Sequence, residues 1–243
     1  MTTPVPVSEV PVSEVPVREV PVSVVVPVFD GARFLAECLA SLAAQDHPSL
    51  EIVVVDDGSR DDSAAIVEAF ADGHPFVRLL RRAHEGLGAS RNAGVDASRG
   101  ELVGFCDADD TWRPDKASTQ VAYLEAHPEV DIALCRQDTV IEPGVSTPDW
   151  LIPDQRYGDL DGVSPTSGLF RRAVFERVRY RTDMDPGTDF DLLVQARGAG
   201  FTISVIDAIL RTRRIHDDNM TTRFGPSRSQ LFASVRGHLQ GRR

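Results

Sequence analysis

The chain has 243 residues, of which 42% are hydrophobic, and this is enough for one substantial core. Its formal net charge of −11 argues against a nucleic-acid-binding protein, because such a protein needs a basic face. Three cysteines without a CxxC pair suggest neither a disulfide framework nor a zinc site. The sequence has no stretch of about 18 apolar residues and no basic-then-apolar N-terminus, so we expect a cytoplasmic protein without a transmembrane segment. Peripheral membrane contact is left open.

Residues 6–23 repeat a five-residue unit, PVSEV, PVSEV, PVREV and PVS. Proline at every fifth position excludes a helix and a central strand. We therefore predict a disordered leader over residues 1–21, and we favour a tolerated extension over a functional tether. A single domain is expected over residues 22–222, followed by a tail or helix over 223–243.

In the first half, continuously apolar segments alternate with segments of helical periodicity. This pattern is typical of an α/β domain with a parallel sheet covered by helices on both faces. The predicted strands are 22–28, 51–55, 77–80 and 102–106, and the predicted helices are 32–44, 61–70, 87–97 and 114–126.

The second half is less regular, and its Pro-, Gly- and Asp-rich stretch predicts a long loop over 142–161. Such a loop beside a nucleotide-binding type of half is a common place for the pocket of a second substrate. The predicted helices of this half are 172–178 and 189–199, and the predicted strands are 131–136, 202–206 and 208–213.

Three carboxylates, Asp107, Asp109 and Asp110, directly follow the apolar run over 101–106. Open α/β sheets place their ligands at the carboxyl ends of the strands, and clustered carboxylates repel one another unless a cation lies between them. Mg²⁺ or Mn²⁺ prefers such oxygen ligands. The alternative is an acidic turn in which Asp110 or Thr111 caps the next helix.

Two further strands end in polar groups that should reach the same edge of the sheet: Phe29-Asp30-Gly31 after the first, and Asp56-Asp57-Gly58-Ser59 after the second. Asp57 could accept a hydrogen bond from the ring N–H of a uracil or from a sugar hydroxyl, and Phe29 offers a ring for base stacking. Each segment alone is also an ordinary turn.

The segments VSVVVPVFDGARFLAECLASLAAQ, EIVVVDDGSRDDS, GLGASRNAG and GELVGFCDADDTWRPDK resemble the donor-binding half of family 2 nucleotide-sugar glycosyltransferases. The resemblance continues through TSGLFRRAVFERV, GTDFDLLVQARGAGF and RTRRIHDDNMT, and it spans roughly residues 22–222. It implies the glycosyltransferase-A fold, a doubly wound, mostly parallel sheet flanked by helices, with a nucleotide-sugar half over 22–128 and a less regular acceptor-binding half over 129–222.

The resemblance also implies roles for individual residues in the donor site. Pro27, Phe29 and Asp57 would contact the base of the nucleotide. Asp107 and Asp109 match the family's Asp-x-Asp motif; the first would touch the donor ribose at the edge of the metal site, and the second would bind the Mn²⁺ or Mg²⁺ that bridges the diphosphate. For Asp110 we favour the helix cap over an outer role at the metal.

Further matching positions are Arg91 near the donor and, as contacts of the donor sugar or acceptor, Trp112, Ser167 and Gly168. Each has an alternative in packing: Arg91 would pair with a carboxylate at the sheet edge, Trp112 would pack on the following helix, and Gly168 would serve only a turn. His216 would complete the metal or diphosphate shell, although a lone histidine is more often a surface or core residue.

Asp189 matches the acid that serves as catalytic base in inverting members. A base must be ionised and within reach of the acceptor hydroxyl as that oxygen attacks the anomeric carbon. The family commonly has Glu-Asp here, whereas this chain has Thr188-Asp189. Asp191 is the second choice for the base.

The resemblance therefore implies a metal-dependent inverting glycosyltransferase, with a UDP-sugar favoured as donor and a glycan, lipid-linked or small-molecule acceptor. Two alternatives stay open. A catalytically silent relative would bind nucleotide sugars only; the loss of Glu before Asp189 keeps this alternative open, and the retention of Asp107, Asp109, Asp189 and His216 argues against it. A sugar nucleotidyltransferase would need a glycine-rich basic loop after the first strand, where this chain has only Gly31 and Arg33.

Overall fold

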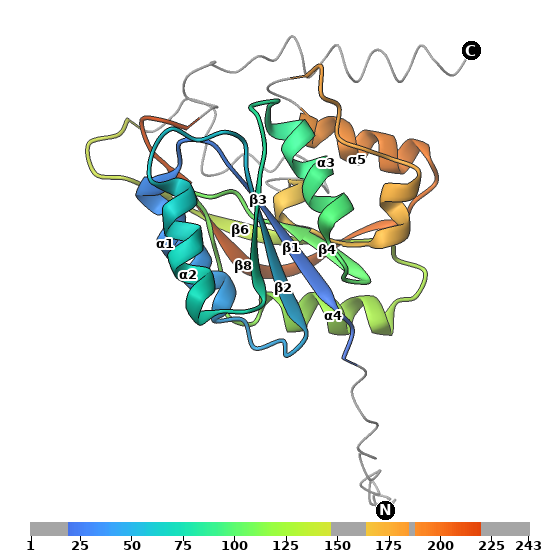
Figure 1. Cartoon of the computed structure of the whole chain (residues 1–243). Coiled ribbons are helices and arrows are strands. Elements are labelled where there is room, and N and C mark those ends of the chain that lie inside the picture. Colours follow the sequence, from blue (N-terminus) through green and yellow to red (C-terminus); the bar gives the residue numbers. More distant parts are fainter. Residues whose placement is uncertain (1–18, 147–163, 185–187, 220–243) are drawn as a thin grey trace, which may run out of the picture.

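The computed structural model of the chain describes residues 19–146, 164–184 and 188–219. Nearly all of the predicted leader, most of the predicted loop over 142–161 and the predicted tail lie outside these residues. In the described part, one eight-stranded sheet has the order β3-β2-β1-β4-β7-β6-β8-β5, with helices on both of its faces (Figure 1).

The first half alternates strands and helices as predicted. β1, β2, β3 and β4 pair in parallel, and β1 and β4 are buried along their whole lengths. Continuous apolar sequence is what a strand covered on both faces requires. The bounds of these elements are β1 (Val22–Val28), α1 (Ala32–Ala43), β2 (Leu50–Asp56), α2 (Ser63–Gly73), β3 (Val77–Arg81), α3 (Leu87–Ala97), β4 (Leu102–Phe105) and α4 (Lys116–Ala126).

The second half completes the same sheet. β7 and the two-residue β5 run antiparallel to their neighbours, and the other strands share one direction, so the sheet is mostly parallel as predicted. The bounds are β5 (Thr111–Trp112), β6 (Ile132–Ile141), η2 (Pro165–Ser167), β7 (Leu169–Arg171), η3 (Arg172–Glu176), α5 (Thr188–Gly198) and β8 (Ile203–Ile215).

The helix predicted over 172–178 is present but shorter. The structure has the short 3-10 helix η3 there, directly after β7. Val174, Phe175 and Val178 are buried in the core, and their spacing resembles that of an amphipathic α-helix. The helix therefore lies where the sequence predicts it, and it is a 3-10 helix that ends at Glu176.

The two strands predicted over 202–206 and 208–213 are one continuous strand, β8. Ile206 pairs with Cys135 and Ile209 with Arg136, so Asp207 and Ala208 form a bulge. A bulge inserts residues without ending the strand, and this one carries an exposed acid that resembles a turn residue in the sequence. β6 is also longer than predicted, because it pairs with β8 as far as Ile141.

Two hydrophobic clusters fill the spaces on either side of the sheet. α1, α2 and α4 contribute side chains to the cluster on one face, and α3, α5 and η3 contribute to the cluster on the other (Figure 1). Within β1, Val24 and Val26 belong to the first cluster and Val25 to the second, as the alternation of side chains along a strand requires. This packing fixes the edge at which β1, β2 and β4 end.

The three cysteines, Cys38, Cys106 and Cys135, are free and buried in the core. Among the described residues, no helix combines the length and the apolar character needed to cross a membrane.

Candidate active site

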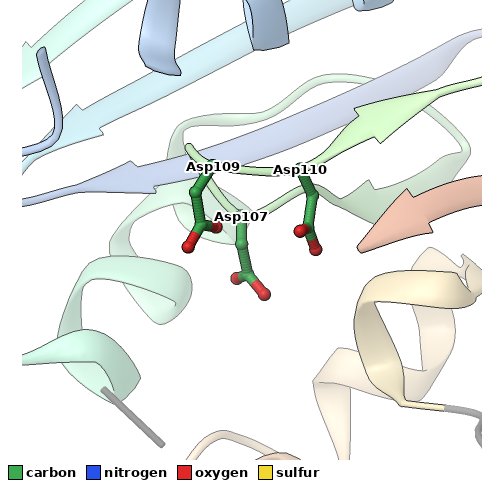
Figure 2. Close-up of side chains that lie close together, drawn as sticks. All are labelled: Asp107, Asp109 and Asp110. Atoms are coloured by element: carbon green, nitrogen blue, oxygen red, sulfur yellow. The ribbon is translucent and has the colours of Figure 1, made fainter. Parts of the chain in front are cut away.

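The loop between β4 and β5 carries the acid cluster. Figure 2 shows the side chains of Asp107, Asp109 and Asp110 projecting to the same side of this loop. One carboxylate oxygen from each lies within 4.8 Å of the others. Three converging carboxylate oxygens are the donor set that Mg²⁺ and Mn²⁺ prefer, so these residues fit the predicted metal.

A different part of the fold holds each carboxylate of this cluster. Arg91 of α3 donates to Asp107 Oδ1 (Nη2 to Oδ1, 2.8 Å). Asp109 Oδ2 lies 3.0 Å from His216 Nε2 and accepts from Asn219 Nδ2 at 2.8 Å. The predicted metal residue His216 is therefore brought to the cluster, directly beside Asp109.

Asp110 does not cap a helix. Its carboxylate pairs with the guanidinium of Arg211 in β8 and accepts from the backbone N–H of Arg214 at 2.8 Å. Asp115 precedes α4 instead, without a side-chain capping bond. Burial raises the pKa of Asp110 to about 7; Arg211 opposes this rise, and the nearby acids of the cluster add to it.

Arg91 joins the acid cluster to the predicted catalytic base. It is buried, and besides Asp107 it pairs with Asp189 at the start of α5. The guanidinium also lies 5.1 Å from the centroid of the Tyr180 ring. Arg91 thus pairs with carboxylates, as its alternative role predicted, and in doing so it brings Asp107 and Asp189 to one place.

The pKa values of the two carboxyl groups that pair with Arg91 are shifted in opposite directions. Burial raises the pKa of Asp189, and Asp107 adds to this rise, while Arg91 opposes it. For Asp107, burial acts in the same direction, but Arg91 and then Arg211 together hold its pKa below the ordinary value. A raised pKa brings a carboxyl closer to the range in which it can accept a proton near neutrality.

The predicted base-binding residues lie at the ends of β1 and β2. Pro27 is buried within β1, whereas Phe29 is 40% exposed just beyond it. Asp57 is buried and accepts hydrogen bonds from the backbone N–H groups of Glu85 and Gly86, at 2.9 and 2.8 Å. The carboxylate expected to receive a base is therefore already used to hold the chain that enters α3.

The predicted sugar or acceptor contacts Trp112, Ser167 and Gly168 lie in the interior. The Trp112 ring covers the ammonium group of Lys116, 3.9 Å from the ring centroid. The Ser167 carbonyl accepts from Lys116 Nζ at 3.2 Å, and a Cβ on Gly168 would lie 2.7 Å from the Phe170 ring. Their surroundings match the packing alternatives, and their roles as contacts stay predictions.

Four residues of this region were not anticipated: His84, Lys116, Arg211 and Asn219. Lys116 is buried, and this burial lowers its pKa to about 8. Arg211 is 2% exposed and reaches Thr166 as well as Asp110. Arg211 is one of three arginines in β8, and nothing in the sequence distinguished it from Arg213 and Arg214. For His84, Lys116 and Asn219, nothing in the sequence indicated which residue each would contact.

A family model described as glycosyl transferase family 2 matches residues 23–179. Among curated relatives, the putative glycosyltransferase EpsH of Bacillus subtilis is 29% identical over 87% of this chain and 65% of its own length. The uncharacterized glycosyltransferase YibD of Escherichia coli is 34% identical over 48% of this chain and 33% of its own length. The chain thus spans between 33% and 65% of the lengths of these two relatives.

Solved structures of two glycosyltransferases have similar folds. S. aureus TarS 1-349 in complex with UDP-GlcNAc has a TM-score of 0.73 at 22% identity, over 90% of this chain and 65% of that one. The mannosyltransferase PcManGT from Pyrobaculum calidifontis, in complex with GDP-Man and Mn²⁺, has a TM-score of 0.69 at 22% identity, over 89% and 64%. These likenesses confirm the predicted glycosyltransferase-A fold. With the family match over more than half of its residues, the chain belongs to glycosyl transferase family 2.

Proposed function

We propose that the protein is an inverting, metal-dependent glycosyltransferase that transfers a sugar from a nucleotide diphosphate donor, preferably a UDP-sugar, to an acceptor hydroxyl. The observation that supports this most is the position of Arg91, which binds Asp107 of the acid cluster and Asp189 together. The Arg91 guanidinium would then lie between the carboxylate near the donor's diphosphate, Asp107, and the carboxylate near the reacting hydroxyl, Asp189.

The acid cluster would receive the donor's diphosphate. Asp109 and Asp107 would hold Mn²⁺ or Mg²⁺ there, with His216 beside Asp109. A bound divalent cation neutralises the charge that develops on a departing diphosphate. The complex of PcManGT with GDP-Man and Mn²⁺ is consistent with this kind of donor and ion.

Asp189 would act as the base. Its carboxylate would take the proton of the acceptor hydroxyl while that oxygen forms a bond to the anomeric carbon and the bond from this carbon to the diphosphate breaks. A single displacement, in which the hydroxyl oxygen attacks the anomeric carbon from the face opposite the leaving diphosphate, inverts the configuration of this carbon. Its raised pKa makes the Asp189 carboxylate a stronger proton acceptor than an ordinary aspartate, provided that it stays ionised at the working pH.

Thr188 stands where the family commonly has Glu, and it is compatible with this role of Asp189. Its side chain is buried, and its hydroxyl donates to the Arg181 carbonyl at 3.2 Å. This bond helps fix the start of α5, the helix that carries Asp189. The substitution therefore replaces a carboxylate with a structural contact and leaves the proposed base in place.

The acceptor would be a glycan, a lipid-linked glycan or a small molecule, and the protein would act in the cytoplasm, with peripheral membrane contact allowed. No nucleic-acid partner is proposed. The exposed Phe190 ring directly beside Asp189 is consistent with an acceptor side that is open to solvent.

A panel of UDP- and GDP-sugars, with and without Mn²⁺, tests this function by thermal shift, because ligands that bind the folded state raise its apparent stability. We expect Mn²⁺-dependent stabilisation by at least one donor. D189N should keep this stabilisation and lose transfer or donor hydrolysis by about 100- to 10,000-fold, the usual contribution of a general base. Unchanged turnover in D189N would remove Asp189 as the base, and a panel without any stabilisation would overturn the proposed function.

A further inference from the structure

The exposed side chain of His84 lies between the two residues that would receive the nucleotide base. Its Nδ1 is hydrogen-bonded to the Asp57 backbone carbonyl at 3.2 Å and lies 2.9 Å from Asp57 Oδ2. Its ring contacts the Phe29 ring with the centroids 4.2 Å apart and the planes tilted by 31°. An imidazole thus presents a flat ring to Phe29 and an N–H to Asp57. These are the two features by which a nucleobase would be recognised at this position.

Asp57 has little room for a second ligand while His84 is in place. Its side chain is only 5% exposed. Oδ1 accepts from the backbone N–H of Glu85, and Oδ2 accepts from the backbone N–H of Gly86. A carboxylate oxygen has two lone pairs, so Oδ2 can accept one further hydrogen bond. The His84 ring nitrogen, 2.9 Å from Oδ2, occupies the space that a base N–H would need, so a base can reach Oδ2 only if this ring moves.

Of the groups next to the Asp57 carboxylate, the His84 ring is the one that can leave without a backbone change. The backbone here is tightly packed, since a Cβ on Gly58 would lie 3.1 Å from His84 N and 3.4 Å from Arg82 O. The His84 side chain, in contrast, is 57% exposed. Exposed side chains change rotamer within nanoseconds, so rotation of this ring would uncover both Asp57 and one face of Phe29.

We propose that His84 acts as a surrogate for the base, occupying the base subsite in the nucleotide-free protein, and that a donor nucleotide must displace it to bind. This inference rests on the proposed function, because it assumes a nucleotide donor. His84 then lowers the affinity for nucleotides, since only the fraction of molecules with the ring turned away is competent to bind. It contributes nothing to the affinity of a ligand without a base.

Isothermal titration of the full chain with UDP, GDP and inorganic pyrophosphate, each with Mn²⁺, tests this in wild type and H84A. Loss of a ring pair of about 0.5–1.5 kcal/mol corresponds to about two- to tenfold, so H84A should bind UDP or GDP more tightly by this factor. Its affinity for pyrophosphate should be unchanged. H127A is the matched control: His127 also contacts an aromatic ring, that of Tyr123, and lies 3.3 Å from the Glu129 carboxylate, at the end of α4.

The outcomes separate the inference from the proposed function. Tighter nucleotide binding by H84A but not by H127A supports the inference. Equal or weaker binding by H84A, with clear binding by wild type, overturns the inference and leaves the proposed function standing. Equal tightening for pyrophosphate also overturns it, because the effect would then not come from the base. Failure of both wild type and H84A to bind any of the three probes overturns the proposed function and the inference together.

Discussion

Replacing Arg91 with methionine removes the counter-charge shared by Asp107 and Asp189 while keeping a side chain of similar length. Burial already raises the pKa of Asp189, and Arg91 opposes that rise. In R91M the pKa of Asp189 should therefore rise further, because the two carboxylates then face each other without a cation between them. A base works only when it is ionised, so any activity left in R91M should be lost at a higher pH as the solution is acidified.

The size of this shift follows from the charges and their exposure. Two unit charges about 4 Å apart attract by about 4 kcal/mol at an effective dielectric constant of about 20, or about three pKa units. The side chains of Asp107 and Asp189 are each 34% exposed, so water screens part of this attraction. We therefore expect the pKa of Asp189 to rise by about one to two units in R91M.

Carbon-13 NMR titration of the Asp189 carboxyl group measures this pKa directly and requires neither a donor nor an acceptor. R91K keeps the charge and should stay close to wild type. R179M removes an exposed arginine that pairs with Asp96, with side chains 40% and 64% exposed, and should leave Asp189 unchanged. Identical titration of Asp189 in wild type and R91M would refute the view that Arg91 governs the charge of Asp189, the proposed base.

Three further changes test other parts of the molecule. Burial lowers the pKa of Lys116 from 10.5 to about 8, so the folded state favours the neutral amine. Between pH 7 and 10, the unfolding free energy of wild type, measured in urea, should therefore rise by about 2 to 3 kcal/mol relative to that of K116M. Parallel pH profiles of the two proteins would contradict this. G94A should lower the melting temperature, although alanine usually favours a helix. The added Cβ would lie 2.2 Å from Val25 Cγ1, and such overpacking costs about 1–3 kcal/mol. G73A is the control, because a Cβ at Gly73 would have no neighbouring atom within 4 Å. D109A should weaken Mn²⁺-dependent nucleotide binding by at least about tenfold, because even the loss of a residue that only hydrogen-bonds to a metal ligand usually costs that much. Equal affinities of D109A and wild type by calorimetry would remove Asp109 from the metal site.

The parallel half of the fold could be predicted because its strands are buried on both faces. Val22–Val28 is apolar at nearly every position, and a run of this kind between helical segments is typical of a strand inside a parallel sheet. β5 could not be predicted, since it has two residues and pairs with Arg211 and Thr212, about a hundred positions later. Its existence depends on tertiary pairing, which local periodicity does not encode.

The site shows the same division. The acids Asp107 and Asp109 stand out because clustered carboxylates at the end of a strand have a recognisable chemistry, whereas Asp189 was indicated only by the resemblance to the family. Their partners do not stand out: the pairing of Asp110 with Arg211 joins residues 101 positions apart. Without that contact, a helix cap was the more economical interpretation of Asp110, and it was wrong. The contact of the His84 ring with the Asp57 carboxylate was equally invisible, because it depends on how two loops meet.

The long strand β8 has a consequence for synthesis of the chain. It provides Arg211 and is followed by His216, and their partners in the acid loop precede them by 101 and 107 residues. At about 5–20 residues per second, a ribosome needs roughly 5–20 s to add this stretch. Until β8 and the residues after it emerge, the nascent chain carries the acid cluster without Arg211, which holds Asp110, and without His216, which holds Asp109. The edge of the sheet that carries the acid cluster, although encoded mainly early in the chain, is thus among the last parts of the domain to mature.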